Sequence, residues 1–126
     1  MLIVKTRLGL SKIHGIGLFA DQNIPKGTMV WKFDSLIDIY IPKSNLKKIP
    51  LSSQEQLLRY IFLDKIRKKY LLCGDDARFF NHSDKPNCDD GIDNITIAIR
   101  NIKKGEELTV NYKVFYGDIK EHEEIK

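Results

Sequence analysis

The densest group of polar side chains in the sequence follows two aromatic residues near the middle of the chain. Residues 78–83 read RFFNHS, and a Pro-Asn pair follows at residues 86–87. Asparagine and histidine side chains both donate and accept hydrogen bonds, so they suit the binding of a polar ligand. A solvated polar loop has the same composition, and composition alone leaves both interpretations open.

Two further stretches combine residue types that serve binding sites. Residues 15–17 read GIG, and two glycines around one residue allow a positive φ or a close approach of the backbone to a ligand. A dinucleotide site needs a third glycine and a following helix, whereas residues 18–20 (LFA) predict a strand. Residues 105–112 read GEELTVNY, and a tyrosine after a strand commonly packs in the core with its hydroxyl bonded. Taken singly, both stretches favour a structural role.

Metal ligation finds little support in the sequence. The candidate ligands are dispersed, with no Cys-x-x-Cys pair and no short spacing between histidines, so we expect no metal site. They are Cys73, Cys88, His14, His82 and His122. The acidic residues between positions 89 and 94 lack the spacing of a calcium loop, and we interpret them as a solvated hairpin turn.

Length and composition indicate one globular domain. The chain has 126 residues, of which 42% are hydrophobic and 30% charged. No apolar run approaches the roughly 20 residues of a membrane helix, and the N-terminus alternates in polarity, so we expect neither a membrane span nor a signal peptide. Two cysteines are too few to staple a secreted mini-protein, which favours an intracellular setting. This setting is the cytoplasm for a bacterial protein, and a nuclear or host-directed location for a viral protein or secreted effector.

The net charge of +4 is a mild excess that arises from 21 basic and 17 acidic residues. Because the basic residues are spread along the chain and the aromatic residues follow no stacking pattern, we do not expect direct nucleic-acid binding. The charge repels a very basic substrate at long range, although local acidic residues can reverse that repulsion. The candidates for this role are Asp75, Asp76, Asp84 and Glu107.

The periodicity predicts a mostly β architecture with one short helix. Alternating or β-branched runs predict strands at residues 2–6, 18–20, 28–33, 37–41, 70–72, 95–99 and 108–110. The helix is expected from about Ser53 to Asp64, and Ser52 with Glu55 has the spacing of a capping box at its start. Its apolar face consists of Leu57, Leu58, Ile61 and Phe62.

The order and spacing of the three stretches resemble the SET domain family of protein-lysine methyltransferases. Residues 12–20 (KIHGIGLFA) with residues 24–27 (IPKG) are similar to the opening of that domain. Residues 78–83 and 86–88 are similar to its central Arg-Phe-x-Asn-His-Ser…Pro-Asn motif, and residues 102–112 (IKKGEELTVNY) to its closing Gly-Glu-Glu-Leu-x-x-Asp-Tyr motif. The resemblance predicts a minimal, stand-alone SET domain over residues 1–118 and a charged tail over residues 119–126.

The family implies both a fold and an activity. The fold has several small β-sheets around a C-terminal knot-like crossing that brings Tyr112 to the central motif. The activity is transfer of a methyl group from S-adenosylmethionine to the ε-amine of a lysine in a protein. A histone, a host protein and a ribosomal protein are candidate substrates. In the family, cofactor and peptide approach from opposite faces and meet through a narrow channel.

The resemblance also implies the roles of individual residues. The implied cofactor-binding residues are His14, Gly15, Ile16, Gly17, Arg78, Phe79, Asn81, His82 and Tyr112. Among them, Asn81 would bond the amino or carboxylate end of the cofactor and His82 would hold its adenine. Tyr112 would also be the catalytic residue at the channel. Because a tyrosine with a pKa near ~10 is a poor base at neutral pH, we expect Tyr112 to orient the amine.

The implied substrate channel contains Val110, Phe115 and Tyr116. Val110 stands two positions before the catalytic tyrosine, where the family often has Tyr or Phe. A smaller side chain without a hydroxyl leaves space around the amine, which favours di- or trimethylation.

The sequence departs from the family pattern in three places. Asp84 replaces a frequent Cys, and Asn111 replaces the Asp before the catalytic tyrosine. No cysteine-rich segment follows Tyr112, so Phe115 and Tyr116 are expected to close the channel, helped by a partner subunit if the protein is a homodimer.

Two other classes fit the sequence less well. A catalytically inactive SET-like module would bind a lysine-bearing peptide, and the intact Asn81, His82 and Tyr112 argue against it. A small basic β protein that binds nucleic acid would show a steep salt dependence of DNA binding.

Overall fold

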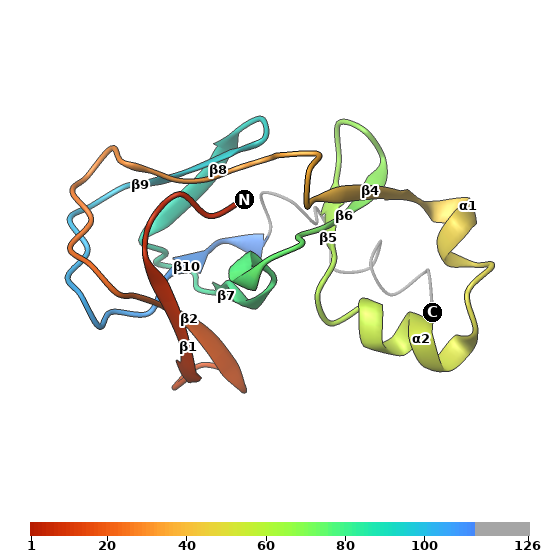
Figure 1. The fold of residues 1–126 in the computed structure, drawn as a ribbon, viewed down its shortest axis with the longest axis horizontal. Helices are drawn as coiled ribbons and strands as arrows, with labels where there is room; N and C mark the ends of the chain where they lie inside the picture. The colour runs from red at the N-terminus through yellow and green to blue at the C-terminus, as the bar shows by residue number, and fades with distance from the viewer. Residues whose placement is uncertain (113–126) are drawn as a thin grey trace.

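The computed structural model describes residues 1–112, whose regular structure is mainly β. Within these residues, ten short strands form four small sheets (Figure 1). The sheets are β1 (Thr6–Leu10) with β2 (Ile16–Ala20); β3 (Met29–Lys32), β9 (Ile95–Ala98) and β8 (Cys88–Ile92); β4 (Ile39–Pro42), β6 (Lys69–Leu72) and β5 (Phe62–Asp64); and β10 (Thr109–Val110) with β7 (Asn81–His82). The architecture of several small sheets confirms the expected fold class.

Short helices fall in the middle of the described chain. They are α1 (Lys43–Leu46), α2 (Leu51–Leu57) and the 3₁₀ helix η1 (Asp76–Phe79). The expected helix therefore exists as α2, but its predicted bounds are wrong and α1 was not predicted. The capping box at Ser52 does not form, because α2 begins after Pro50 without a side-chain cap. The helix ends early because residues 62–64 pair with β6, and their backbone groups then bond across the sheet.

Most predicted strands are present within a residue or two, except the first, and strands β5, β7 and β8 were not predicted. The first strand begins at Thr6, and Leu2 makes only a single bridge, to Trp31. Strand β8 was missed because residues 89–91 read as a turn. The chain instead reverses after β8, where Asn94 adopts a φ of 61°, a conformation that Asn tolerates better than most residues.

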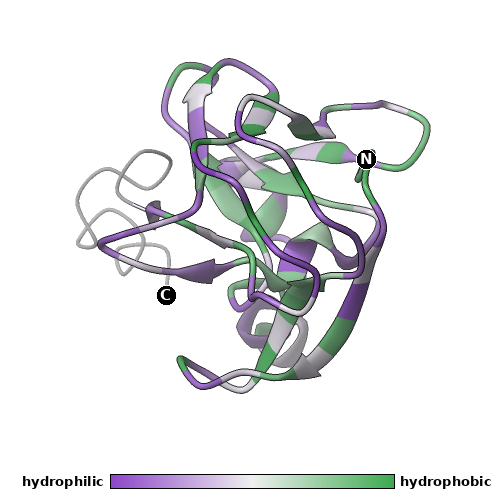
Figure 2. Cartoon of the chain, turned by 90° about the vertical axis from the view of Figure 1, so that its left-hand side faces the viewer, coloured by the Kyte–Doolittle hydropathy of each residue, from purple (hydrophilic) through white to green (hydrophobic). Residues whose placement is uncertain are grey.

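Two clusters of buried side chains hold the sheets together. The larger cluster joins β2, β3, β6, β9 and β10, and the smaller one packs α1 and the segment after α2 against β5 and β6. In Figure 1 the β4–β6–β5 sheet and both α-helices accordingly lie on one side of the molecule. Figure 2 shows hydrophobic and hydrophilic residues alternating along several strands, the pattern expected of sheets with one buried face. No helix among residues 1–112 has the length and apolarity to cross a membrane.

The parallel pairing of β7 with β10 positions the candidate site. Thr109 lies opposite Asn81 and Val110 opposite His82, so the closing stretch of the sequence runs beside the central one. The buried Asn87 fastens this pairing: its Nδ2 donates to the Glu107 carbonyl at 2.8 Å, and its Oδ1 accepts from the Thr109 N–H at 2.9 Å. The family implies a knot-like crossing near the C-terminus, and this pairing is the part of it that lies within residues 1–112. The predicted boundary at residues 118–119 lies outside the described residues.

Candidate active site

A cleft of about 510 Å³ lies between the β1–β2 turn, the segment after α2, and the stretch from η1 to β7. This volume is typical of small-molecule sites. The cleft contains all of the nine predicted cofactor-binding residues except Gly17. Its lining also includes Ile13, Arg59, Tyr60 and Phe80, which the sequence analysis did not select.

Asn81 connects the two halves of the cleft. Its Nδ2 donates to the His14 carbonyl at 3.0 Å and to Glu107 Oε2 at 2.9 Å, and lies 3.3 Å from the Ile16 carbonyl. These bonds hold the β1–β2 turn against β7. No donor among residues 1–112 is bonded to Asn81 Oδ1, so this oxygen can accept a hydrogen bond from a ligand in the cleft.

Glu107 is a site residue that the sequence analysis interpreted differently. Its carboxylate accepts two contacts from Ser11 Oγ, at 2.8 and 2.9 Å, besides the bond from Asn81. A Cβ on Gly17 would lie 2.6 Å from Glu107 Oε2, so only glycine lets this carboxylate lie against β2. The close approach expected of Gly17 is therefore an approach to Glu107. The other glycine, Gly15, has a φ of +48° and allows the turn itself.

His82 joins β7 to the residue that follows β10. Its Nδ1 accepts a hydrogen bond from the Tyr112 N–H at 3.0 Å, which leaves Nε2 protonated to donate to Asp84 Oδ1 at 3.0 Å. This arrangement fixes one tautomer of the imidazole. Asp84, noted above as a departure from the family pattern and as a local acid that could attract a basic substrate, thus holds His82 in place.

Tyr112 lies half-buried at the inner end of the cleft. Its hydroxyl donates a short hydrogen bond to the Phe80 carbonyl, and its ring meets the edge of Phe62 at a centroid distance of 6.0 Å. Burial, with a smaller effect of the Glu107 charge, raises the pKa of Tyr112 to about 12. The hydroxyl therefore stays protonated at neutral pH, which supports a role in orientation and excludes a role as general base.

Arg78 and Phe79 shape the wall of the cleft opposite the β1–β2 turn. The Arg78 guanidinium donates to the Cys73 carbonyl at 3.0 Å and lies 5.7 Å from the centre of the Tyr60 ring. The Phe79 ring contacts Tyr60 edge-to-face at 5.6 Å. The two residues thus position Tyr60, an aromatic surface on which a planar group can stack.

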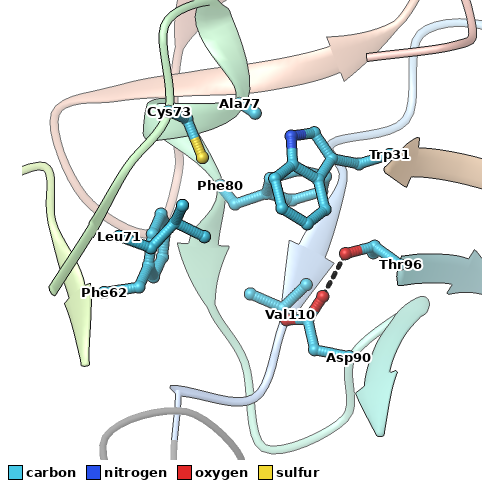
Figure 3. A pocket seen from close by; sticks show the side chains of 9 residues that line it. All are labelled: Trp31, Phe62, Leu71, Cys73, Ala77, Phe80, Asp90, Thr96 and Val110. Atoms are coloured by element: carbon cyan, nitrogen blue, oxygen red, sulfur yellow. Dashed lines mark hydrogen bonds between the residues drawn. The ribbon is translucent and has the colours of Figure 1, made fainter. Parts of the chain in front are cut away.

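Of the three residues expected to form the substrate channel, the structure describes Val110. Val110 is 2% exposed and lines a separate inner cavity of about 20 Å³, shown in Figure 3. Phe80 contributes to both spaces. Phe115 and Tyr116 lie outside the described residues. Among residues 1–112, no group of three or more acidic, histidine or cysteine side chains is arranged to hold a metal ion.

Comparisons with known proteins agree on one family. The family model described as the SET domain matches residues 15–113. The human histone-lysine N-methyltransferase 2D is 34% identical over 124 residues, which cover 88% of this chain and 2% of that protein. The H3 lysine-4 specific enzyme of Schizosaccharomyces pombe is 36% identical over 118 residues, which cover 83% of this chain and 12% of that protein. This chain thus spans only a small part of these curated relatives.

Solved structures share the fold. A candidate histone methyltransferase of Plasmodium falciparum matches with a TM-score of 0.61 and 25% identity, over 86% of this chain and 93% of that one. The polycomb repressive complex 2 of Chaetomium thermophilum, in an autoinhibited conformation bound to S-adenosylmethionine, matches with a TM-score of 0.70 and 22% identity. That match covers 94% of this chain and 16% of the other.

Proposed function

The chain belongs to the SET domain family, and we propose that it transfers methyl groups from S-adenosylmethionine to the ε-amine of a lysine in a protein substrate. The observation that carries this proposal is the cleft that joins the β1–β2 turn to Asn81, His82 and Tyr112. These residues come from three distant parts of the sequence, and they are the ones at which the family motifs match.

The residues of the cleft fit S-adenosylmethionine. The free acceptor Asn81 Oδ1 suits the ammonium of its methionine part, and the backbone at His14 and Gly15 offers polar groups beside it. Tyr60 and Phe79 offer aromatic surface for the adenine. When bound, S-adenosylmethionine supplies a methyl group on a positively charged sulfur.

The chemical contribution of the protein is chiefly alignment and desolvation. Lysine must lose a proton before it attacks, because its pKa is near ~10.4 in water. Apolar walls around the amine and a nearby positive charge lower that pKa. The Tyr112 hydroxyl is fixed by the carbonyl of Phe80, a residue that lines both the cleft and the inner cavity, and would orient the amine. Alignment of this kind can contribute roughly 7–11 kcal/mol to lowering a barrier.

Replacement of Asn81 by alanine should weaken cofactor binding. The variant loses the free acceptor and releases the His14 carbonyl and the Glu107 carboxylate that Asn81 now holds. Loss of one buried polar partner corresponds to about tenfold weaker binding. Isothermal calorimetry with S-adenosylmethionine measures this change, and Asn45→Ala, at an exposed position of α1, is the matched control. Equal affinities of Asn81→Ala and the wild type would contradict the role of Asn81.

Val110 supports formation of di- or trimethyl-lysine. It borders the inner cavity and brings no hydroxyl, so it does not restrain the amine by hydrogen bonding. We expect Val110→Tyr to shift the products toward monomethyl-lysine in a mass-spectrometric time course. Because added volume can strain a buried site, Val110→Thr tests the added hydroxyl at nearly constant volume. Wild-type product that stops at one methyl group, with enzyme in excess, would contradict this assignment.

The relatives support a proposal for the substrate class and for the setting. Since the relatives are named as histone-lysine methyltransferases, we propose a lysine-bearing protein as substrate, with a histone as the first candidate, and an intracellular setting. A homodimer remains our prediction, tested by sedimentation of the active protein.

The second candidate function is a SET-like module that binds a lysine-bearing peptide without catalysis. Calorimetry also separates the two functions, because a module of this kind does not need S-adenosylmethionine. Saturable binding of S-adenosylmethionine at one site per chain is expected for the enzyme. Absence of that binding in the folded wild-type protein would favour the module.

A further inference from the structure

Two further cavities lie outside the cleft, and the inner one is lined by Phe62 and Phe80, which both contact Tyr112. The inner cavity, drawn in Figure 3, has apolar walls that include Phe62, Phe80 and Val110. An outer cavity of about 120 Å³ reaches the rim formed by residues 64–66 and 93–94. Both cavities are lined by Trp31, Leu71 and Asp90, so these three side chains mark the place where one adjoins the other.

Among residues 1–112, Asp90 is the one charged side chain in the lining of the inner cavity. Its carboxylate accepts a short hydrogen bond from Thr96 Oγ1, seen as the dashed line in Figure 3. Across residues 1–112, no basic side chain forms an ion pair with it. Lys65 lines the outer cavity as well, and the nearby Arg67 is bonded to Asp64 at 2.8 Å and to Asp93 at 2.7 Å.

The ionised form of a carboxylate in these surroundings has an unfavourable desolvation free energy. Desolvation, with a smaller contribution from the neighbouring Asp89 charge, raises the pKa of Asp90 to about 7, although the Thr96 hydrogen bond opposes that rise. A cation that entered the cavity would offset the cost, because it would supply the missing charge partner. The site therefore favours a ligand with a positively charged end.

A lysine side chain matches these cavities in shape and in polarity. Its methylene groups suit walls of Trp31, Leu71 and Phe80, and its ammonium suits a single carboxylate flanked by aromatic rings. On the basis of the function proposed above, we propose that Asp90 recognises the ammonium of the substrate lysine as the side chain passes from the outer cavity toward Tyr112. The inner cavity, at about 20 Å³, has room for about one water molecule, so it must widen as the lysine enters.

This assignment also changes which acidic residue is expected to attract the substrate. Of the acidic residues selected from the sequence, Asp75 binds the Leu2 and Ala77 N–H groups, Asp84 binds His82, and Glu107 binds Ser11 and Asn81. The charges of these three are thus engaged within the protein, and the fourth, Asp76, is exposed on η1. The outer cavity is lined by Asp64, Asp90 and Asp93, of which Asp64 and Asp93 pair with Arg67. Within residues 1–112, Asp90 is therefore the acid of this lining that has no ion-pair partner.

The test uses Trp31, the single tryptophan of the chain, which borders both cavities. Its fluorescence is followed while the full-length protein is titrated with n-butylammonium chloride or with uncharged n-butanol at constant ionic strength. We expect the wild type to bind butylammonium about tenfold more tightly than butanol, the difference between a charge-assisted and a neutral hydrogen bond. Asp90→Asn should remove this preference while leaving butanol binding unchanged.

The matched control is Asp89→Asn, which removes a neighbouring carboxylate of β8 that borders neither cavity. It should keep the preference within about twofold. Equal binding of both probes by the wild type, or an unchanged preference in Asp90→Asn, would overturn the assignment. So would an equal loss of affinity for both probes, because a purely structural role predicts that result.

The same variants separate this assignment from the proposed function. If the protein is a methyltransferase, Asp90→Asn should raise the KM for the protein substrate about tenfold, with an unchanged KM for S-adenosylmethionine. Methyl transfer by the wild type with no change in either readout for Asp90→Asn would overturn the role of Asp90 alone. Absence of methyl transfer by the wild type, with the butylammonium preference intact, would overturn the proposed function alone.

Discussion

Tyr112→Phe is expected to keep the fold and bind S-adenosylmethionine within about twofold of the wild type, yet lose about 10²–10³ in turnover. The variant removes one hydroxyl that is anchored by the Phe80 carbonyl, and it keeps the ring that packs against Phe62. The loss should fall on kcat, since a hydroxyl that orients the amine acts chiefly in the transition state. Single-turnover methyl transfer and calorimetry together measure the two effects.

Tyr40→Phe provides the matched control for this prediction. Tyr40 lies on β4 and borders neither the cleft nor the inner cavity, and its hydroxyl also donates a hydrogen bond, to Asn94. Its turnover should stay within about twofold of the wild type. Turnover of Tyr112→Phe close to that of the control would remove Tyr112 from the chemistry.

Asn87→Ala is expected to destabilise the protein by about 2–5 kcal/mol. Asn87 is 2% exposed, and its side chain satisfies the Glu107 carbonyl and the Thr109 N–H. Each buried backbone group left without a partner costs roughly 1–3 kcal/mol. Since β7 and β10 share only two residue pairs, this side chain supplies a large part of their attachment.

Chemical denaturation measures that effect, with Asn45→Ala as the control. Asn45 is exposed on α1, so its replacement should change the free energy of unfolding by less than about 0.5 kcal/mol. A similarly small change for Asn87→Ala would mean that the closing segment is held by other contacts.

The sequence motifs were sufficient to predict most of the lining of the cleft, because a motif match carries information about residues that the fold brings together. Periodicity alone gives no indication that His82 and Tyr112 are neighbours, since 30 positions separate them. Their contact depends on the parallel β7–β10 pairing, which involves only two residues of each strand.

Other site residues escaped the sequence analysis for physical reasons. Glu107 was interpreted as a local acid that could attract a basic substrate, because its partner Ser11 is 96 positions away in the sequence. Asp90 was interpreted as part of a turn, whereas strand β8 places it between two cavities.

The helix prediction failed for a related reason. Leu57, Leu58, Ile61 and Phe62 have helical spacing, but Phe62 pairs with Leu71 across a sheet. The tertiary pairing with β6 overrides a local pattern that fits a helix equally well.

The most direct test of the central claim is one mass-spectrometric measurement. The wild-type protein is incubated with S-adenosylmethionine that carries a deuterated methyl group. A cell lysate supplemented with purified histones provides the substrates, and the labelled residues are identified. The proposed function predicts deuterated methyl groups on the ε-amines of specific lysines, which disappear when Tyr112→Phe replaces the wild type. Label on no lysine in the presence of the folded wild-type protein would contradict it.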